Sequence, residues 1–104
     1  MQLNKLKQKE VDHLFEAVLT LESIEDCYRF FEDLCTVGEI KSLAQRLEVA
    51  RMLQKGYTYS QIEADTGAST ATISRVKRCL HYGTDGYQLA LDRLEQKKES
   101  APSE

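Results

Sequence analysis

The chain has 104 residues, of which 41% are hydrophobic and 30% charged, a composition typical of one soluble globular domain. No apolar run approaches the roughly 18 residues that span a bilayer, and the charged start is not followed by a signal-type apolar block. These features predict a cytoplasmic protein with no membrane partner. The net charge of −3 divides unevenly, with −5 over residues 1–40, +4 over 41–82 and −2 over 83–104. The basic middle segment suits phosphate contact, although an ordinary solvated face would have the same charge.

Six segments repeat apolar residues at steps of three and four, which is the helical period, and no strand-like alternation is present. The expected helices cover about residues 6–19, 24–35, 37–55, 58–66, 69–81 and 85–97. Each is expected to bury one apolar stripe. The sequence therefore predicts an all-α fold, with a single helical domain over residues 1–96 and a flexible polar tail over 97–104. Six short helices bury little surface, so composition makes a dimer reasonable.

Helix boundaries are marked by hydroxyl residues placed three positions before a carboxylate or amide. In this spacing the hydroxyl accepts from a first-turn amide while the third residue reaches back to the cap. Glycine at the other end allows the left-handed conformation that stops a helix. The expected caps are Ser23, Thr36 and Thr58, with Ser69 and Thr84 as further candidates, and the expected stops are Gly56, Gly67 and Gly83.

The three cysteines and two histidines do not form a metal-binding pattern. Cys27, Cys35 and Cys79 lie far apart without a C-x-x-C spacing, and His13 and His81 do not complete a zinc set. Reduced, partly buried thiols are the expected state. The sequence predicts no metal and no cofactor. It also contains no nucleophile motif, no paired catalytic carboxylates and no glycine-rich phosphate loop, which argues against an enzyme.

Residues 58–81 have the plan of a helix-turn-helix, with two short capped helices separated by Gly67. Ile73, Val76 and Leu80 are expected to face the core. Small polar residues at the start of the second helix could approach base edges, while basic residues further along could neutralise phosphates. The predicted DNA contacts are Thr58, Tyr59, Ser60, Ser69, Thr70, Ala71, Thr72, Ser74, Arg75, Lys77 and Arg78.

These features predict a sequence-specific DNA-binding transcriptional regulator with double-stranded DNA as its partner, acting as a repressor. The alternative is an adaptor or protein-interaction module with weak, nonspecific nucleic-acid binding. The acidic first forty residues favour that alternative, and so does Glu63, whose charge would repel a nearby phosphate. Sequence preference and salt dependence distinguish the two, because nonspecific phosphate binding weakens steeply with salt.

The stretch from Thr36 to Leu94 resembles the tryptophan repressor (TrpR) family, in particular its YerC/YecD-like branch. The matching pieces are Thr36-x-x-Glu39, Leu43-x-x-Arg46, Lys55-Gly56 and Gly67-Ala68-x-x-Ala71-Thr72-Ile73-Ser74-Arg75. The resemblance implies an intertwined homodimer whose two recognition helices read a pseudo-palindromic operator. It would give Phe15, Tyr28, Phe30 and Phe31 a place in a core shared by two subunits, although packing within one subunit would also explain them.

The resemblance also implies an effector pocket at Thr36, Arg46, Arg75 and Cys79. Val76 stands where the family has the glycine that underlies the indole, and Cys79 replaces a serine that contacts the amino group. A valine side chain would occupy the indole's space, and a lost hydrogen-bond partner weakens binding of a polar ligand. Tryptophan is therefore not expected as a corepressor. Arg46 and Arg75 either bind another small anionic effector or pair with acidic neighbours such as Glu39.

Overall fold

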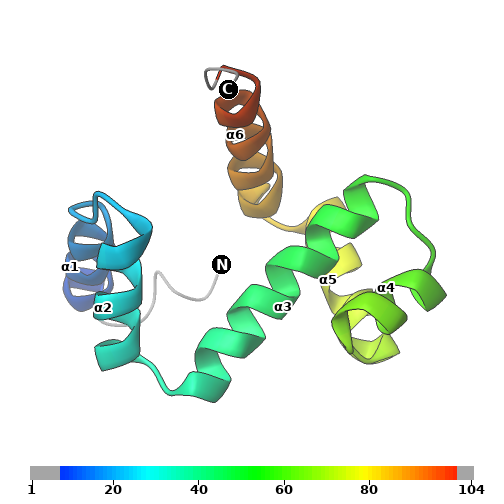
Figure 1. The fold of residues 1–104 in the computed structure, drawn as a ribbon, viewed down its shortest axis with the longest axis horizontal. Helices are drawn as coiled ribbons and strands as arrows, with labels where there is room; N and C mark the ends of the chain where they lie inside the picture. Colours follow the sequence, from blue (N-terminus) through cyan, green and yellow to red (C-terminus); the bar gives the residue numbers. More distant parts are fainter. Residues whose placement is uncertain (1–7, 101–104) are drawn as a thin grey trace. The chain divides into compact units, whose positions relative to one another are not determined.

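The computed structural model describes residues 8–100, which form six helices and contain no strand (Figure 1). The helices are α1 (Gln8–Val18), α2 (Ile24–Leu34), α3 (Val37–Gln54), α4 (Tyr59–Thr66), α5 (Thr70–Tyr82) and α6 (Gly86–Ser100). The predicted all-α architecture is confirmed, and α6 extends a few residues beyond its expected end. The chain divides into two compact units, unit 1 ending at Ile40 and unit 2 beginning at Lys41.

Predicted hydroxyl caps start most of the helices. The Ser23 Oγ accepts a hydrogen bond from the Asp26 backbone N–H at 3.0 Å, and α2 begins at the next residue. At α4 the Thr58 hydroxyl accepts from the Gln61 N–H, while the Gln61 side chain accepts from the Thr58 N–H at 2.8 Å, which completes a capping box. Thr84 is not such a cap, because α6 begins only at Gly86.

The N-terminus of α3 is closed by the same reciprocal arrangement. The Thr36 N–H donates to Glu39 Oε1 at 2.8 Å, and the Glu39 N–H donates to Thr36 Oγ1 at 3.1 Å. The hydrogen bond from the Thr36 backbone, followed by that with its hydroxyl, lowers the pKa of Glu39 below its ordinary value of 4.5. Ionised Glu39 therefore favours the folded helix start.

We expect this stabilisation to be present above about pH 4.5 and to be lost as the pH falls through the lowered pKa of Glu39, since the folded state binds its proton less tightly than the unfolded state does. Glu39→Gln keeps an oxygen acceptor but cannot titrate. The free energy of unfolding, measured against pH for both proteins, should show a shallower acid decline in the variant. Identical declines would contradict the assignment.

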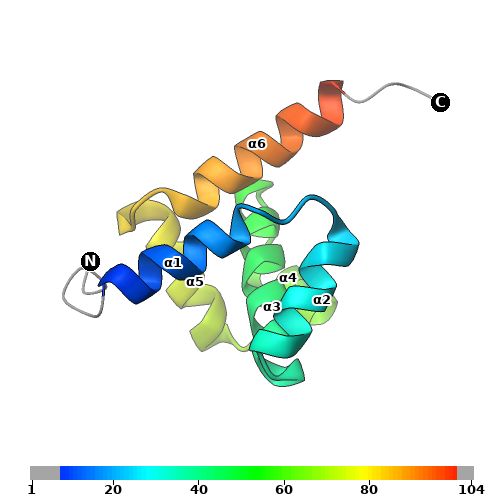
Figure 2. The same cartoon turned by 90° about the vertical axis from the view of Figure 1, so that its left-hand side faces the viewer.

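Unit 2 is built around one apolar core to which all four of its helical segments contribute. The buried residues are Val49, Ala50 and Met52 from α3, Ile62 from α4, Ala68 from the turn, Ile73 and Val76 from α5, and Leu91 from α6. Figure 2 shows α6 following α5 through a short connection. The three-helix arrangement of α3, α4 and α5 is thus fixed by shared burial, with α6 anchored to it by Leu91.

Unit 1 has no comparable core, because α1 and α2 contain no buried residue. Phe15 is 52% exposed, Tyr28 is 63% exposed and Ile24 is 77% exposed. The prediction of one buried stripe per helix is therefore wrong for α1 and α2 within a single chain. Packing inside one subunit does not account for Phe15 and Tyr28, whereas Phe30 and Phe31 are half-buried and stack edge to face at 5.4 Å.

All three cysteines are free, as expected, but Cys27 and Cys79 are exposed and only Cys35 is half-buried. The expectation of partial burial is wrong for these two, because Cys27 lies on α2, which has no buried residue, and Cys79 lies on the outer side of α5. None of the helices within residues 8–100 is long and apolar enough to cross a lipid bilayer.

Candidate nucleic-acid interface

The turn between α4 and α5 is held by hydrogen bonds on both sides. Gly67 has a φ of 73°, the left-handed conformation that glycine adopts without strain, and its N–H donates to the Glu63 carbonyl at 2.9 Å. The Ala68 N–H donates to Thr66 Oγ1 at 3.1 Å. From α3, the Gln45 side-chain amide donates to the Thr66 carbonyl at 3.1 Å. These bonds fix the turn, and therefore the direction of α5, relative to α3.

The first turn of α5 is capped by Ser69. Its Oγ accepts from the Thr72 N–H at 3.2 Å and lies 3.1 Å from the Thr72 hydroxyl, with which it also hydrogen-bonds. Thr72 is half-buried, so it is less accessible than its neighbours. Ser69 and Thr72 therefore shape the start of the helix, and their hydroxyls are already engaged within the protein.

The outer side of α5 carries the other predicted contacts. Thr70, Ala71 and Ser74 are exposed, whereas Ile73 and Val76 are at most 1% exposed and face the core. Thr70, Ser74 and Lys77 follow one another at steps of four and three, which places them along one side of the helix. The side chains at the N-terminal end of this surface are small, so a flat surface such as a base edge could approach the helix closely.

Three basic residues follow on the same helix. Arg75, Lys77 and Arg78 are exposed, and within residues 8–100 none of them forms an ion pair. Arg51 differs, because its Nε donates to the Glu48 carboxylate at 3.0 Å. That hydrogen bond lowers the pKa of Glu48 and raises the pKa of Arg51. Among the described residues, α5 thus offers three exposed positive charges without an acidic partner.

The N-terminus of α4 brings Thr58, Tyr59 and Ser60 into the same unit. Thr58 and Ser60 are exposed, and Tyr59 is half-buried with the Lys77 Nζ 5.6 Å from its ring centroid. This cation–π contact links the start of α4 to the basic residues of α5. The hydroxyl and the backbone N–H of Thr58 are both engaged in the cap, so the exposed Ser60 side chain carries the freer hydroxyl. Glu63 is also exposed, as the adaptor alternative requires.

The residues of the implied effector pocket are divided between the units. Thr36 belongs to unit 1 and is occupied by Glu39, whereas Arg46, Arg75 and Cys79 belong to unit 2. The Arg46 Nε donates to the Ser42 carbonyl at 3.4 Å. Pairing of Arg46 or Arg75 with Glu39 stays a prediction, since Glu39 belongs to unit 1 and both arginines to unit 2.

Sequence reasoning missed the structural parts played by Gln45 and Thr66. The Thr66 hydroxyl donates a hydrogen bond to the Ile62 carbonyl at 2.7 Å, and the Thr66 carbonyl accepts one from the Gln45 side-chain amide. Gln45 and Thr66 are 21 positions apart, and no local spacing signals such a contact. Thr66 could have been singled out as a hydroxyl residue directly before the turn glycine.

The family model described as Trp repressor protein matches residues 9–95. The protein YerC of Bacillus subtilis (strain 168), which is described as uncharacterized, is 62% identical over 103 residues, covering 99% of both chains.

Two solved structures have the same fold. The structure of a candidate Trp repressor from Staphylococcus aureus is 60% identical in sequence, with a TM-score of 0.88. The match covers 91% of this chain and 95% of the Staphylococcus aureus chain. A TrpR-like protein of Eubacterium eligens ATCC 27750 is 55% identical with a TM-score of 0.85, over 88% and 95%. The six helices, the matched residues and these relatives together show that the chain belongs to the Trp repressor protein family.

Proposed function

We propose that the protein is a sequence-specific DNA-binding regulator, a homodimer that represses transcription by occupying a pseudo-palindromic operator. Membership of the Trp repressor family indicates a DNA-binding regulator rather than an enzyme. The observation that carries the proposal is the outer side of α5, which exposes small side chains followed by three basic ones, while the inner side of the same helix is buried in the core. Small groups at the helix N-terminus suit base edges, and the cations suit phosphates.

The homodimer is supported by the apolar surface that unit 1 leaves uncovered. No residue of α1 or α2 is buried. Five large apolar side chains in and next to these helices are at least 51% exposed, namely those of Phe15, Leu19, Ile24, Tyr28 and Leu34. Two helices that fold in water need to cover such stripes. The family resemblance supplies the occupant, which is unit 1 of a second copy.

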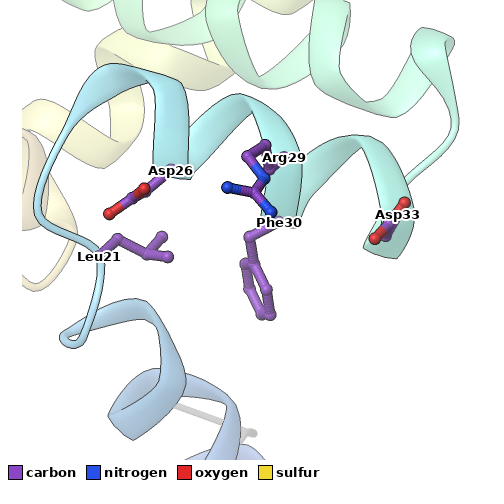
Figure 3. Close-up of a pocket in the computed structure, with 5 residues that line it drawn as sticks. All are labelled: Leu21, Asp26, Arg29, Phe30 and Asp33. Carbon is purple, nitrogen blue, oxygen red and sulfur yellow. The ribbon is translucent and has the colours of Figure 1, made fainter.

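A hollow of about 260 Å³ beside α2 adds polar groups to this surface. Figure 3 shows the Arg29 side chain between Asp26 and Asp33, with Phe30 projecting from the same helix and Leu21 nearby. Arg29 forms no ion pair within residues 8–100. Apolar groups flanked by charges of both signs are suited to an interface with a matching second copy.

A symmetric dimer would present two copies of α5 to one face of a duplex. For helix-turn-helix dimers the half-sites lie about one helical turn apart, roughly 34 Å, and the operator repeats the twofold symmetry of the protein. Each α5 would enter a major groove with Thr70, Ala71 and Ser74 near the bases. Arg75, Lys77 and Arg78 would then lie close to the phosphates.

The regulator is proposed to act without tryptophan as corepressor. Val76 is 1% exposed and its side chain belongs to the core of unit 2, where a glycine would leave space. Cys79 offers only a weak hydrogen-bonding group in place of a hydroxyl. Isothermal titration calorimetry with tryptophan should detect no stoichiometric binding, and tight binding with one tryptophan per chain would overturn this part of the proposal.

Selection from randomised duplexes at about 0.15 M salt, with no added ligand, tests the proposal directly. The wild-type protein should enrich a pseudo-palindrome. Arg75→Ala should lose the enrichment, whereas Arg93→Ala, which removes the same charge from an exposed position on α6, should retain it. A preferred sequence that survives equally in both variants would remove Arg75 from the interface.

The adaptor remains the second candidate, favoured by exposed Glu63 and by the acidic character of unit 1. An adaptor would enrich no sequence in the same selection. Its weak binding to duplexes would also fall steeply as the salt concentration rises and would differ little between sequences. That result would leave the helix-turn-helix as a scaffold and would reject sequence-specific regulation.

A further inference from the structure

Unit 2 contains a cavity of about 410 Å³ that adjoins the candidate interface and shares Tyr59 and Lys77 with it. It is formed by the end of α3, the connection into α4, the later half of α5 and the first turn of α6. Its volume falls within the roughly 300–1,000 Å³ that is usual for small-molecule sites. The cavity lies on a different side of α5 from the effector pocket that the family resemblance implies. Lys77 and His81 line it, and they are two positions away from Arg75 and Cys79, a rotation of about 200° around the helix.

The walls of the cavity suit a flat apolar body. Leu53 and Leu80 are half-buried and pack against the core, so they form a fixed apolar side. Tyr57 and Tyr59 add two aromatic rings, of which Tyr57 is 43% exposed. Aromatic rings favour stacked or edge-on contact with another ring, beyond the contribution of the area they bury. The shape and composition of these walls therefore favour a planar aromatic ligand.

The polar groups of the cavity favour an anion. Lys77 supplies a full positive charge, and none of the nine residues that line the cavity carries a carboxylate. The side-chain amides of Gln54 and Gln88 form no hydrogen bond within residues 8–100, so each can donate to a ligand. A carboxylate would gain charge-assisted hydrogen bonds from such a set.

We propose that this cavity binds a small planar aromatic carboxylate, and that the bound ligand weakens the attachment of the protein to DNA. The second part rests on the proposed function, since Lys77 and Tyr59 belong both to the cavity and to the predicted DNA contacts. An ammonium group that pairs with a ligand carboxylate is less available to a phosphate. The ligand is thus an inducer that releases the operator.

Binding is tested first without DNA, by following backbone amide NMR signals during titration with benzoate and 2-naphthoate. The neutral amides benzamide and 2-naphthamide have the same shapes and serve as charge controls. We expect at least one carboxylate to shift the signals of residues 53–59, 77–81 and 88, and its amide to shift them less. Equal binding of acid and amide, or no shift from either carboxylate at millimolar concentration, would overturn the cavity assignment.

A matched pair of variants locates the site. Gln88→Glu places a negative charge in the cavity, while Gln96→Glu makes the same change on the same helix outside it. Gln88→Glu should weaken carboxylate binding by about 10-fold, the effect of roughly 1.4 kcal/mol of repulsion, and Gln96→Glu should not. Neither residue is a predicted DNA contact, but a carboxylate at position 88 would itself face Lys77, so the two variants are compared by their ligand binding in the absence of DNA. Equal effects of the two variants would overturn the assignment.

The link to DNA is measured last, on the duplex enriched by selection. A saturating carboxylate should raise the dissociation constant of the wild-type complex by about 5-fold or more, within the usual range of coupling between two sites. An unchanged constant would reject the inducer role. If no duplex is enriched but the carboxylate binds, the proposed function fails while the cavity assignment stands.

Discussion

Replacing Ile73 with alanine is expected to lower the free energy of unfolding by about 2–5 kcal/mol, the usual cost of removing a large buried aliphatic side chain. Ile73 is fully buried and lies on the inner side of α5, among core residues contributed by α3, α4 and α6. A domain of this size is stable by only about 5–15 kcal/mol, so the loss is a large fraction of the total. Urea denaturation followed by circular dichroism measures it.

The neighbouring residue provides the control. Ser74 is exposed on the outer side of the same helix, so Ser74→Ala should change the free energy of unfolding by no more than about 0.5 kcal/mol. It should nevertheless weaken binding to the selected duplex, because it removes a hydroxyl from the proposed base-reading surface. Comparable stability losses in the two variants would contradict the division of α5 into an inner and an outer side.

Replacing Phe15 with glutamate is expected to weaken dimerisation by about 100-fold or more. Phe15 is 52% exposed in the single chain, where a carboxylate would cost little. In the proposed dimer a second copy covers this surface, so the glutamate would be an unpaired buried charge, which costs several kcal/mol. Each ~1.4 kcal/mol raises the dissociation constant of the dimer tenfold. Sedimentation equilibrium over a range of protein concentrations measures the change, and operator binding should fall with it.

Glu16→Gln, a change at the next residue of α1 that keeps a polar side chain, serves as the control and should leave the dimer intact. Tyr28→Glu tests α2 in the same way, since Tyr28 is 63% exposed in the single chain. A wild-type protein that sediments as a monomer at all concentrations would reject the homodimer. Unchanged association in both glutamate variants would place the dimer interface elsewhere.

Local signals in the sequence predicted most of the fold. The caps at Ser23, Thr58 and Ser69 involve groups only three residues apart, and they form as the spacing indicates. Gly67 occupies the left-handed conformation expected of a turn glycine. Gly83 was expected to end α5 in the same conformation, but its φ is −86°. A Cβ there would lie 2.4 Å from the Cys79 carbonyl oxygen, so glycine is needed for close approach instead.

Burial was harder to predict than helix position. The apolar steps of α2 are as regular as those of α5, yet Ile24 and Tyr28 are exposed whereas Ile73 and Val76 are buried. Periodicity identifies which side of a helix is apolar, but it does not identify what covers that side. The cavity in unit 2 could not be predicted either, because its residues come from three separate stretches of the sequence whose relative positions depend on tertiary packing.

The absence of a buried core in α1 and α2 has a consequence for the amount of regulator in a cell. In the proposed homodimer, pairing would shield the apolar side chains of unit 1, whereas an unpaired chain would leave them accessible to chaperones and proteases. Newly made chains would then survive in proportion to how often they meet a second copy. The level of active regulator would therefore rise more steeply than the rate of its synthesis, so that a low basal rate leaves the operator free.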